Sequence, residues 1–243
     1  MSSLQQILSF AFLLLSTALA QGIWVWPKLE PGAVGEFRRS GRSYQRPGGR
    51  LELGEVVWNG TSSTPGSSCL LWRDGSGRER WRRRFVLARQ WSNPATGAVE
   101  ETSYPNALVE ACESDRVILR FSLGCWDKQR KLKSGCGVVA LRLRDGEELW
   151  RSSPVAMDLT NQTLYGFVHG RDLYEFYQQL ASDQIAVLKR GLDDGKAHWL
   201  VHIHSGRLVS AKMTRGGLEL TCQSGSFSKK IRLNPATGKQ VGQ

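Results

Sequence analysis

The sequence predicts an all-β protein built by repeating an antiparallel unit of about four strands. The pentapeptide Asn-Pro-Ala-Thr-Gly occurs at residues 93–97 and again at residues 234–238, with Asp-Gly turns between the copies at Asp145-Gly146 and Asp194-Gly195. The turn glycines recur at steps of 49, 49 and 43 residues, a period typical of repeat architectures. Nine tryptophans and 26 glycines against three methionines also favour strands and turns over helices.

The N-terminus has the pattern of a secretory signal. An apolar run at residues 7–15 is followed by Ala18 and Ala20, small residues that predict cleavage after Ala20. The run is too short to span a bilayer comfortably, although an uncleaved anchor is the alternative and no Lys or Arg precedes it. We expect residues 1–20 to be a signal peptide, the mature chain to be secreted or periplasmic, and no membrane span to remain after cleavage.

Residues 21–52 differ in composition from the rest of the chain. Arginines at 38, 39, 42, 46 and 50 lie among Gly, Ser and Pro, a composition that favours an irregular or partly extended basic arm. Trp24 and Trp26 alternate about Val25, so a short strand added to the main sheet is expected here. The repeat domain is expected at residues 53–243.

Strand-forming runs then follow in order along the repeat domain. They lie at residues 55–58, 116–123, 137–143, 184–188 and 228–233. The last three lead into turn glycines, and Trp150 and Trp199 each come four residues after theirs. A unit of about four short strands has the content of one propeller blade.

One segment of the repeat domain is ambiguous. Within residues 172–181, Leu173, Phe176, Tyr177 and Leu180 have helical spacing. The segment occupies a strand position in the repeat, so we predict a strand.

The strongest copy of the repeat lies at residues 139–150, Val-Ala-Leu-Arg-Leu-Arg-Asp-Gly-Glu-Glu-Leu-Trp. It resembles the repeat of pyrroloquinoline-quinone-type β-propellers, in which a strand ending in Ala-Leu precedes an Asp, a Gly turn and a Trp. Residues 185–199 and 229–241 resemble it more loosely, and residues 86–100 least. The resemblance implies a propeller-like fold of about four or five blades, either a small ring or an incomplete propeller, where the family usually has seven or eight.

The resemblance points to the non-catalytic branch of this family, whose propellers act as scaffolds for protein assembly at the cell envelope. The quinone-dependent members carry an adjacent Cys-Cys pair and an acidic calcium site. This sequence has no Cys-Cys pair and no position that matches the acidic cluster. No nucleophile motif of the Gly-x-Ser-x-Gly type occurs either. We therefore expect no catalytic residue and no cofactor.

Five cysteines allow a disulfide in an exported chain but leave at least one thiol over. Cys125 and Cys136 are the best pair, because each follows a Gly and a polar segment lies between them, as in a hairpin loop. The alternative is two free thiols at strand ends. No Cys-x-x-Cys pattern occurs, so a structural zinc site is not expected.

The formal net charge of +11 predicts attraction to anionic partners. Two basic runs form the candidate anion-binding surface, with Trp81 and Trp126 as stacking partners. The alternative is a solvated edge whose long basic side chains prevent strand-to-strand aggregation. The candidate residues are Arg80, Arg82, Arg83 and Arg84 in the first run, and Lys128, Arg130, Lys131 and Lys133 in the second.

Three of the four histidines fall on one strand. His198, His202 and His204 share a face, opposite Trp199, Val201 and Ile203. Imidazoles two residues apart can bind zinc or copper, but a metal site also needs a third ligand and an orienting second shell. We favour solvent-facing polar residues and predict no metal site.

The sequence thus predicts an exported, non-catalytic binding or scaffold protein with a basic β-repeat surface. The expected partner is an acidic protein or an anionic envelope polymer, with nucleic acid the least favoured. An open sheet edge would also allow a homo-oligomer. The alternative is an enzyme, or a metal- or cofactor-binding propeller, with a loop-face site near His198, His202 and His204.

Overall fold

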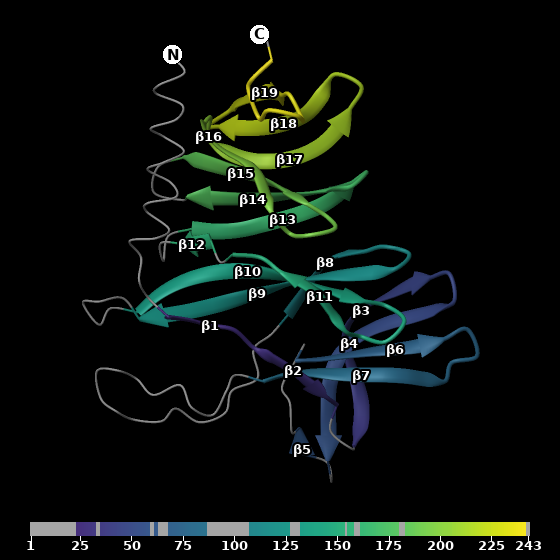
Figure 1. Cartoon of the computed structure of the whole chain (residues 1–243). Helices are drawn as coiled ribbons and strands as arrows, with labels where there is room; N and C mark the ends of the chain where they lie inside the picture. Colours follow the sequence, from purple (N-terminus) through teal and green to yellow (C-terminus); the bar gives the residue numbers. More distant parts are fainter. Residues whose placement is uncertain are drawn as a thin grey trace.

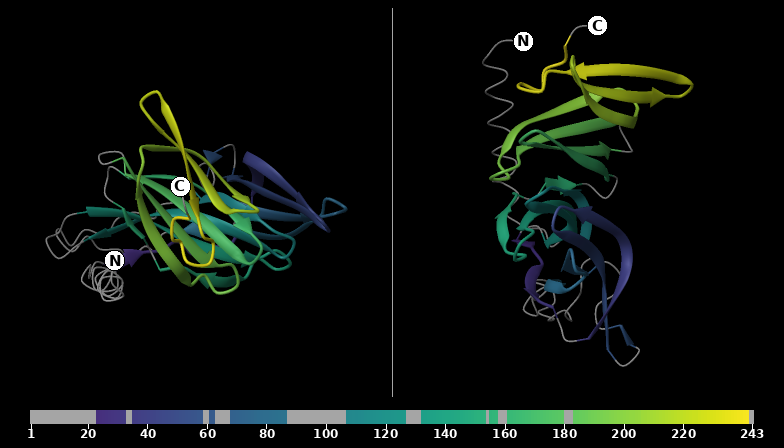
Figure 2. Two further views of the ribbon diagram at one scale, coloured as in Figure 1. Left: turned by 90° about the horizontal axis from the view of Figure 1, so that it is seen from above. Right: turned by 90° about the vertical axis from the view of Figure 1, so that its right-hand side faces the viewer.

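The computed structural model contains four antiparallel sheets arranged in a stack (Figure 1). It describes residues 23–32, 35–58, 61–62, 68–86, 107–126, 132–153, 155–157, 161–179 and 183–241. Every regular element within these ranges is a strand. The first and last sheets lie at opposite ends of the stack, so the ring is not closed (Figure 2). The predicted all-β repeat is confirmed, in the form of an incomplete propeller-like arrangement.

The first sheet has the order β2-β7-β6-β4-β3, and the short β5 pairs with β4. Its core is formed by the antiparallel strands β3, β4, β6 and β7, which are neighbours in this order. The strands are β2 (Lys28–Pro31), β3 (Glu36–Arg46), β4 (Gly49–Trp58), β5 (Thr61–Ser62), β6 (Cys69–Asp74) and β7 (Glu79–Val86).

The second sheet repeats this arrangement with β8, β9, β10 and β11. β8 pairs with β9, β9 with β10 and β10 with β11, while the short β1 and β12 add to β9 and β10. The strands are β1 (Ile23–Val25), β8 (Ala107–Cys112), β9 (Arg116–Trp126), β10 (Leu132–Arg142), β11 (Glu148–Arg151) and β12 (Val155–Met157).

The third sheet has four strands, and the fourth has three. The third is β13 (Asn161–His169), β14 (Asp172–Gln179), β15 (Gln184–Gly191) and β16 (Ala197–His204). The fourth is β17 (Arg207–Thr214), β18 (Gly217–Ser224) and β19 (Phe227–Leu233). After β19 the chain turns back and forms one isolated bridge, Leu233 to Gln240.

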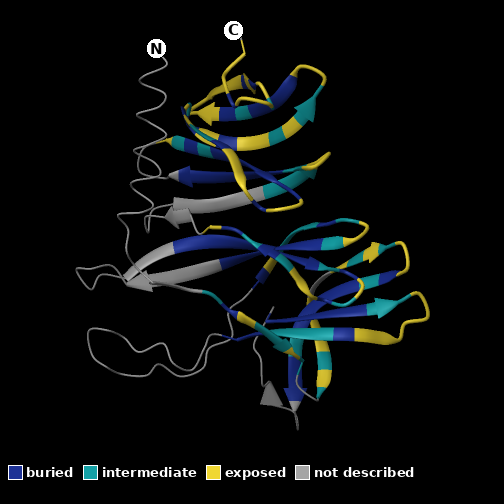
Figure 3. Cartoon of the chain, viewed as in Figure 1, coloured by how far each residue is buried: buried dark blue, intermediate teal, exposed yellow. Residues whose placement is uncertain are grey.

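Apolar side chains join the sheets face to face (Figure 3). Leu70 and Phe85 of the first sheet pack with Val117 and Phe121 of the second, and the rings of Phe85 and Phe121 meet edge to face at 5.0 Å. Further clusters join the second sheet to the third and the third to the fourth. The two middle sheets therefore bury both of their faces.

Burial on both faces explains the ambiguous segment. β14 is a strand, as predicted, and lies between β13 and β15. Leu173, Tyr174, Phe176 and Tyr177 are all buried, because neighbouring sheets cover both sides of this strand. A strand that is buried on both faces loses the alternating pattern, so its apolar positions also agree with helical spacing.

A tryptophan in each of the first three sheets contacts the tight turn of the next. Indole N–H groups of Trp81, Trp150 and Trp199 donate to the carbonyls of Leu143, Leu192 and Pro235, at 2.6, 2.8 and 3.0 Å. Each acceptor lies three residues before a turn glycine of positive φ: Gly146, Gly195 and Gly238. The regular spacing of tryptophan and turn glycine along the sequence therefore reflects a contact that recurs between successive sheets.

Within the described residues, a further turn of the repeat lies at Gly77. Gly77 has a φ of 82°, sits between β6 and β7, and precedes Trp81 by four residues. The pentapeptide at residues 93–97 lies outside the described residues, as does the proposed signal peptide. In the described residues, the repeated turn thus occurs at Gly77, Gly146, Gly195 and Gly238.

The boundary predicted between arm and repeat domain, after residue 52, falls within a strand. β4 spans Gly49–Trp58, so a division after residue 52 would cut through a central strand. β3 pairs with β4 along most of its length, and the arginines of this segment belong to the first sheet. The short strand expected near Trp24 is present as β1, which pairs with β9 of the second sheet. No helix in the described ranges has the length and apolar character to cross a membrane.

Candidate interaction surface

The arginines of β7 are held by acceptors of the protein itself. Arg80 pairs with Asp74 at 2.9 Å, and Arg84 pairs with Glu30 at 2.9 Å. Arg82 pairs with Glu79 at 2.7 Å and donates to the carbonyl of Gly35 at 2.9 Å. Arg83 donates to the carbonyls of Asp145 and Gly146, both at 3.1 Å, and so links the first sheet to the turn of the second. Arg80 is the most exposed of the three ion-paired arginines, at 56%.

The second predicted basic run cannot be placed in full. Lys128, Arg130 and Lys131 lie outside the described residues. Lys133 belongs to β10, where its backbone is opposite Cys125, but its side chain is not described. The two predicted runs are therefore not shown to form one surface.

The predicted disulfide between Cys125 and Cys136 stays a prediction, because the side chain of Cys125 lies outside the described ones. Cys136 is buried. The register sets Cys136 opposite Ser122 and Cys125 opposite Lys133. The two cysteines are thus three positions apart along the hairpin and assigned to opposite faces, whereas a disulfide needs adjacent Cβ atoms.

Two other cysteines are poor nucleophiles. Burial raises the pKa of Cys69 to about 12 and the pKa of Cys112 to about 11, although nearby arginines oppose the shift. Since the thiolate is the reactive form, both stay in the unreactive thiol form at neutral pH. They contribute to the packing of the sheets.

The three histidines of β16 lie on its exposed side, as predicted. Nδ1 of His198 is 3.7 Å from Asp172, and Nε2 of His204 is 3.2 Å from the amide nitrogen of Gln184. Partial desolvation and the neighbouring His204 lower the pKa of His202. Across the described ranges, no three His, Cys, Asp or Glu side chains are grouped as metal ligands.

A buried polar cluster lies between the second and third sheets. Arg120 pairs with Glu110 at 2.6 Å, and Arg190 pairs with Glu175 at 2.5 Å. Tyr177 donates to Glu175 at 2.7 Å, and its ring lies 5.4 Å below the guanidinium of Arg120. Burial raises the pKa of Glu110, with Arg120 opposing, and raises that of Tyr177 well above its usual range. The charges balance and the four ionic side chains are at most 7% exposed, so we interpret the cluster as an inter-sheet contact.

The outer face of the fourth sheet is different in character. Its inner face packs Leu218, Leu220 and Cys222 against the third sheet. On the outer face, three cations surround the carboxylate of Glu219. The nitrogen-to-oxygen distances are 3.6 Å for Lys212, 3.5 Å for Lys230 and 3.8 Å for Arg232. The cations are 65%, 68% and 50% exposed, while Glu219 is 10% exposed.

The register of the sheet explains this arrangement. Glu219 on the central β18 is directly opposite Lys212 on β17 and Arg232 on β19. Lys230 lies one pair further along the same face. Removal from water raises the pKa of Glu219, but Lys230 and Lys212 outweigh this and hold that pKa below its usual value. We call Lys212, Glu219, Lys230 and Arg232 the basic face.

Few acidic residues are available to neutralise the basic face. Residues 205–243 contain seven basic residues and one acidic residue, Glu219, a formal charge of +6. By contrast, residues 21–86 contain twelve basic and six acidic residues. The two ranges have the same formal charge, but residues 205–243 have the higher ratio of basic to acidic residues, seven to one against twelve to six.

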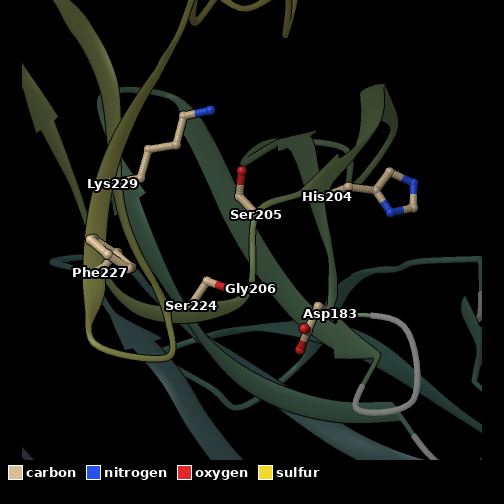
Figure 4. Close-up of a pocket in the computed structure, with 7 residues that line it drawn as sticks. All are labelled: Asp183, His204, Ser205, Gly206, Ser224, Phe227 and Lys229. Carbon is tan, nitrogen blue, oxygen red and sulfur yellow. The ribbon is translucent and has the colours of Figure 1, made fainter.

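An open depression of about 390 Å³ lies at the mouth between the third and fourth sheets (Figure 4). Phe227 and Lys229 come from β19, and Ser205 and Gly206 from the connection between β16 and β17. The imidazole of His204 points away from Lys229. Phe227 is 80% exposed, the highest value among the large apolar side chains described.

The outer edge of β19 is open beside this depression. β19 pairs with β18 on one side, and the N–H of Val241 donates to the carbonyl of Arg232 on the other, at 2.8 Å. In an antiparallel strand, backbone groups of alternate residues point to the same side. Ser228 and Lys230 therefore direct their N–H and C=O groups outward, as Arg232 does. Within the described ranges, no strand pairs with this part of the edge.

The sequence analysis missed the basic face. Lys212, Lys230 and Arg232 are dispersed along the chain, whereas the arginines of β7 form the densest run. The available signal was the local ratio of basic to acidic residues rather than the density of basic ones. In residues 205–243 seven basic residues share one acidic residue, against twelve to six in residues 21–86.

Comparison with known proteins gives only distant likenesses. No family model matches the chain, and no curated protein matches it. Among solved structures, the computationally designed Ika8 protein is similar at 11% identity and a TM-score of 0.33, covering 90% of this chain and 74% of that one. BamB from Moraxella catarrhalis is similar at 12% identity and a TM-score of 0.18, covering 90% and 88%. Neither likeness bears on function at these TM-scores.

Proposed function

We propose that the protein is an exported, non-catalytic binding protein whose basic face recognises an acidic partner, either a protein or an anionic polymer of the envelope. The observation that carries the proposal is the sharing of one carboxylate, Glu219, by Lys212, Lys230 and Arg232. One carboxylate neutralises only part of the charge of three cations, so these cations still attract further anions. The arginines of β7 have more complete internal pairing.

Exposure of the cations favours recognition over a purely structural role. Exposed ion pairs contribute little to stability, typically less than about 1 kcal/mol each. Positive charge gathered on one surface speeds and orients the encounter with an acidic partner. The long apolar stems of Lys212 and Lys230 can pack against a partner while their amino groups meet its carboxylates.

We also propose that the chain belongs to the pyrroloquinoline-quinone-like repeat family, in its non-catalytic branch. The contact of Trp81, Trp150 and Trp199 with successive turns supports this proposal, because it recurs at equivalent positions in three sheets. Export is proposed from the signal-like pattern of residues 1–20.

Charge reversal tests the proposed function. The full chain would be titrated against fluorescently labelled polyglutamate at low salt, with anisotropy as the readout. The double variant Lys212→Glu, Arg232→Glu should weaken binding by at least about tenfold, because each reversal turns an attraction of several tenths of a kcal/mol into a repulsion. Added salt should reduce the difference.

The matched control reverses two exposed arginines elsewhere. Arg144 and Arg171 are 77% and 83% exposed and lie on turns of the second and third sheets. Arg144→Glu, Arg171→Glu carries the same net charge change but should weaken binding less than about threefold. Equal effects of the two double variants, or no binding by the wild type, would exclude the basic face as the recognition surface.

A further inference from the structure

We infer that the free edge of β19 binds an acidic, extended segment of a partner protein, which adds to the fourth sheet as its fourth strand. This inference rests on the proposed function and specifies how the acidic partner is held. The carrying observation is the open edge at Ser228 and Lys230, bordered by cations on both faces of the sheet.

The backbone of β19 supplies the main contacts. The N–H and C=O groups of Ser228 and Lys230 point away from β18 and lack a strand partner in the described chain. An extended segment of about five residues can satisfy them, since the bridge at Leu233 and the bond from Val241 to Arg232 close the rest of the edge. The other three sheets each have at least four strands, so the added strand would complete the pattern.

Side chains on both faces of β19 select for acidic residues. Lys230 and Arg232 lie on the outer face, and Lys229 lies on the inner face over the depression. Carboxylates at alternate positions of an added strand would meet Lys230 and Arg232 across the strand pair, and a carboxylate at an intervening position would meet Lys229. Phe227, which is 80% exposed beside Lys229, offers a contact for one apolar residue of the segment.

The same charges disfavour a second copy of this chain as the occupant. Pairing two β19 edges would set the lysines and Arg232 of one copy against those of the other, and like charges opposite each other destabilise a strand pair. Lysines on an edge strand are a known protection against self-association. The cations of β19 that would repel a second β19 would attract an acidic strand instead.

Backbone methylation of the ligand tests strand addition separately from charge. The full chain would be titrated with a labelled peptide of alternating glutamate and valine, and with two analogues N-methylated on the glutamates or on the valines. All three peptides have the same charge. Strand addition predicts that one analogue loses about tenfold or more in affinity, because its methyl groups face β19, and that the other binds normally.

A variant of the protein provides the reciprocal test. Ser228→Pro removes an outward N–H without changing the charge, and proline is tolerated on an edge strand where its nitrogen faces solvent. It should weaken peptide binding by about tenfold, whereas the control Ser228→Ala should stay within about twofold of wild type. The bound peptide should also slow amide hydrogen exchange at Lys230.

The outcomes separate this inference from the proposed function. If the peptide binds but both analogues and Ser228→Pro bind equally well, strand addition is wrong and the basic face acts by charge alone. If polyglutamate, the peptide and an anionic polysaccharide all fail to bind, the proposed function fails as well. If only an anionic polysaccharide binds, or if Ser228→Pro instead abolishes a dimer seen by sedimentation, a protein segment is not the occupant.

Discussion

The turn glycines that meet a tryptophan have two independent reasons to lack a side chain. Gly195 has a φ of 68°, in the left-handed region, and an added Cβ would lie 2.4 Å from a ring atom of Trp150. Gly77 has a similar φ of 82°, but an added Cβ would meet nothing within 4 Å. A side chain at Gly77 would therefore meet backbone strain alone, whereas a side chain at Gly195 would meet both backbone strain and a steric clash.

Gly195→Ala should therefore destabilise the protein more than Gly77→Ala. Both variants suffer the strain of a positive φ, about 1–2 kcal/mol. Gly195→Ala also displaces the ring of Trp150 from the turn, which should add about 1–3 kcal/mol. Urea unfolding of both variants measures the difference, and equal losses would mean that the tryptophan contact contributes little.

Residue-level patterns predicted this contact only in part. The spacing of Trp150 and Trp199 from their glycines is visible in the sequence, and so is their suitability for packing between units. The acceptor carbonyls of Leu192 and Pro235 belong to the next sheet and could not be inferred from a local pattern. The same reason explains why the internal partners of Arg84 and Arg83 were not predicted: Glu30 and Asp145 are distant from them in the chain.

At the scale of the element, the fourth sheet is distinguished by its two unlike faces. Leu218 and Leu220 face the core, while Glu219 between them faces the cations of the neighbouring strands. This alternation is readable from the sequence as a half-buried strand. By contrast, the strands of the first sheet were not predicted as such between residues 28 and 46, because their Arg-, Gly- and Ser-rich composition is typical of irregular segments.

The lowered pKa of Glu219 predicts a pH dependence of stability. A carboxyl whose pKa is lower in the folded state stabilises the fold above its unfolded pKa, about 4.3, and this contribution is lost as the pH falls through the folded value. The stability difference between wild type and Glu219→Gln should thus shrink as the pH is lowered from about 6 to about 3. Urea unfolding across this range measures it.

Removal of the cations provides the control for this titration. In the background Lys212→Gln, Lys230→Gln, the pKa of Glu219 should rise, because these lysines are the charges that lower it. The effect of Glu219→Gln should then depend less on pH. An unchanged pH dependence would show that the cations do not set the ionisation of Glu219.

At the scale of the whole molecule, positive charge gathers at both ends of an open stack. Residues 21–86 and residues 205–243 each carry a formal charge of +6, and the intervening residues are close to neutral. The ends differ in their acidic residues, six in the first range and one in the second. The total charge can be read from the sequence. The ion pairs that neutralise the arginines of β7 could be identified only from the structure.

The most direct test of the account compares one cation at each end of the stack. Lys230 and Arg80 are 68% and 56% exposed, and each lies near a single carboxylate, Glu219 and Asp74. Affinity of the full chain for labelled polyglutamate would be measured for Lys230→Glu and for Arg80→Glu. We predict that Lys230→Glu weakens binding by about tenfold and Arg80→Glu by less than about twofold. The reverse order, or equal losses, would contradict the assignment of recognition to the fourth sheet.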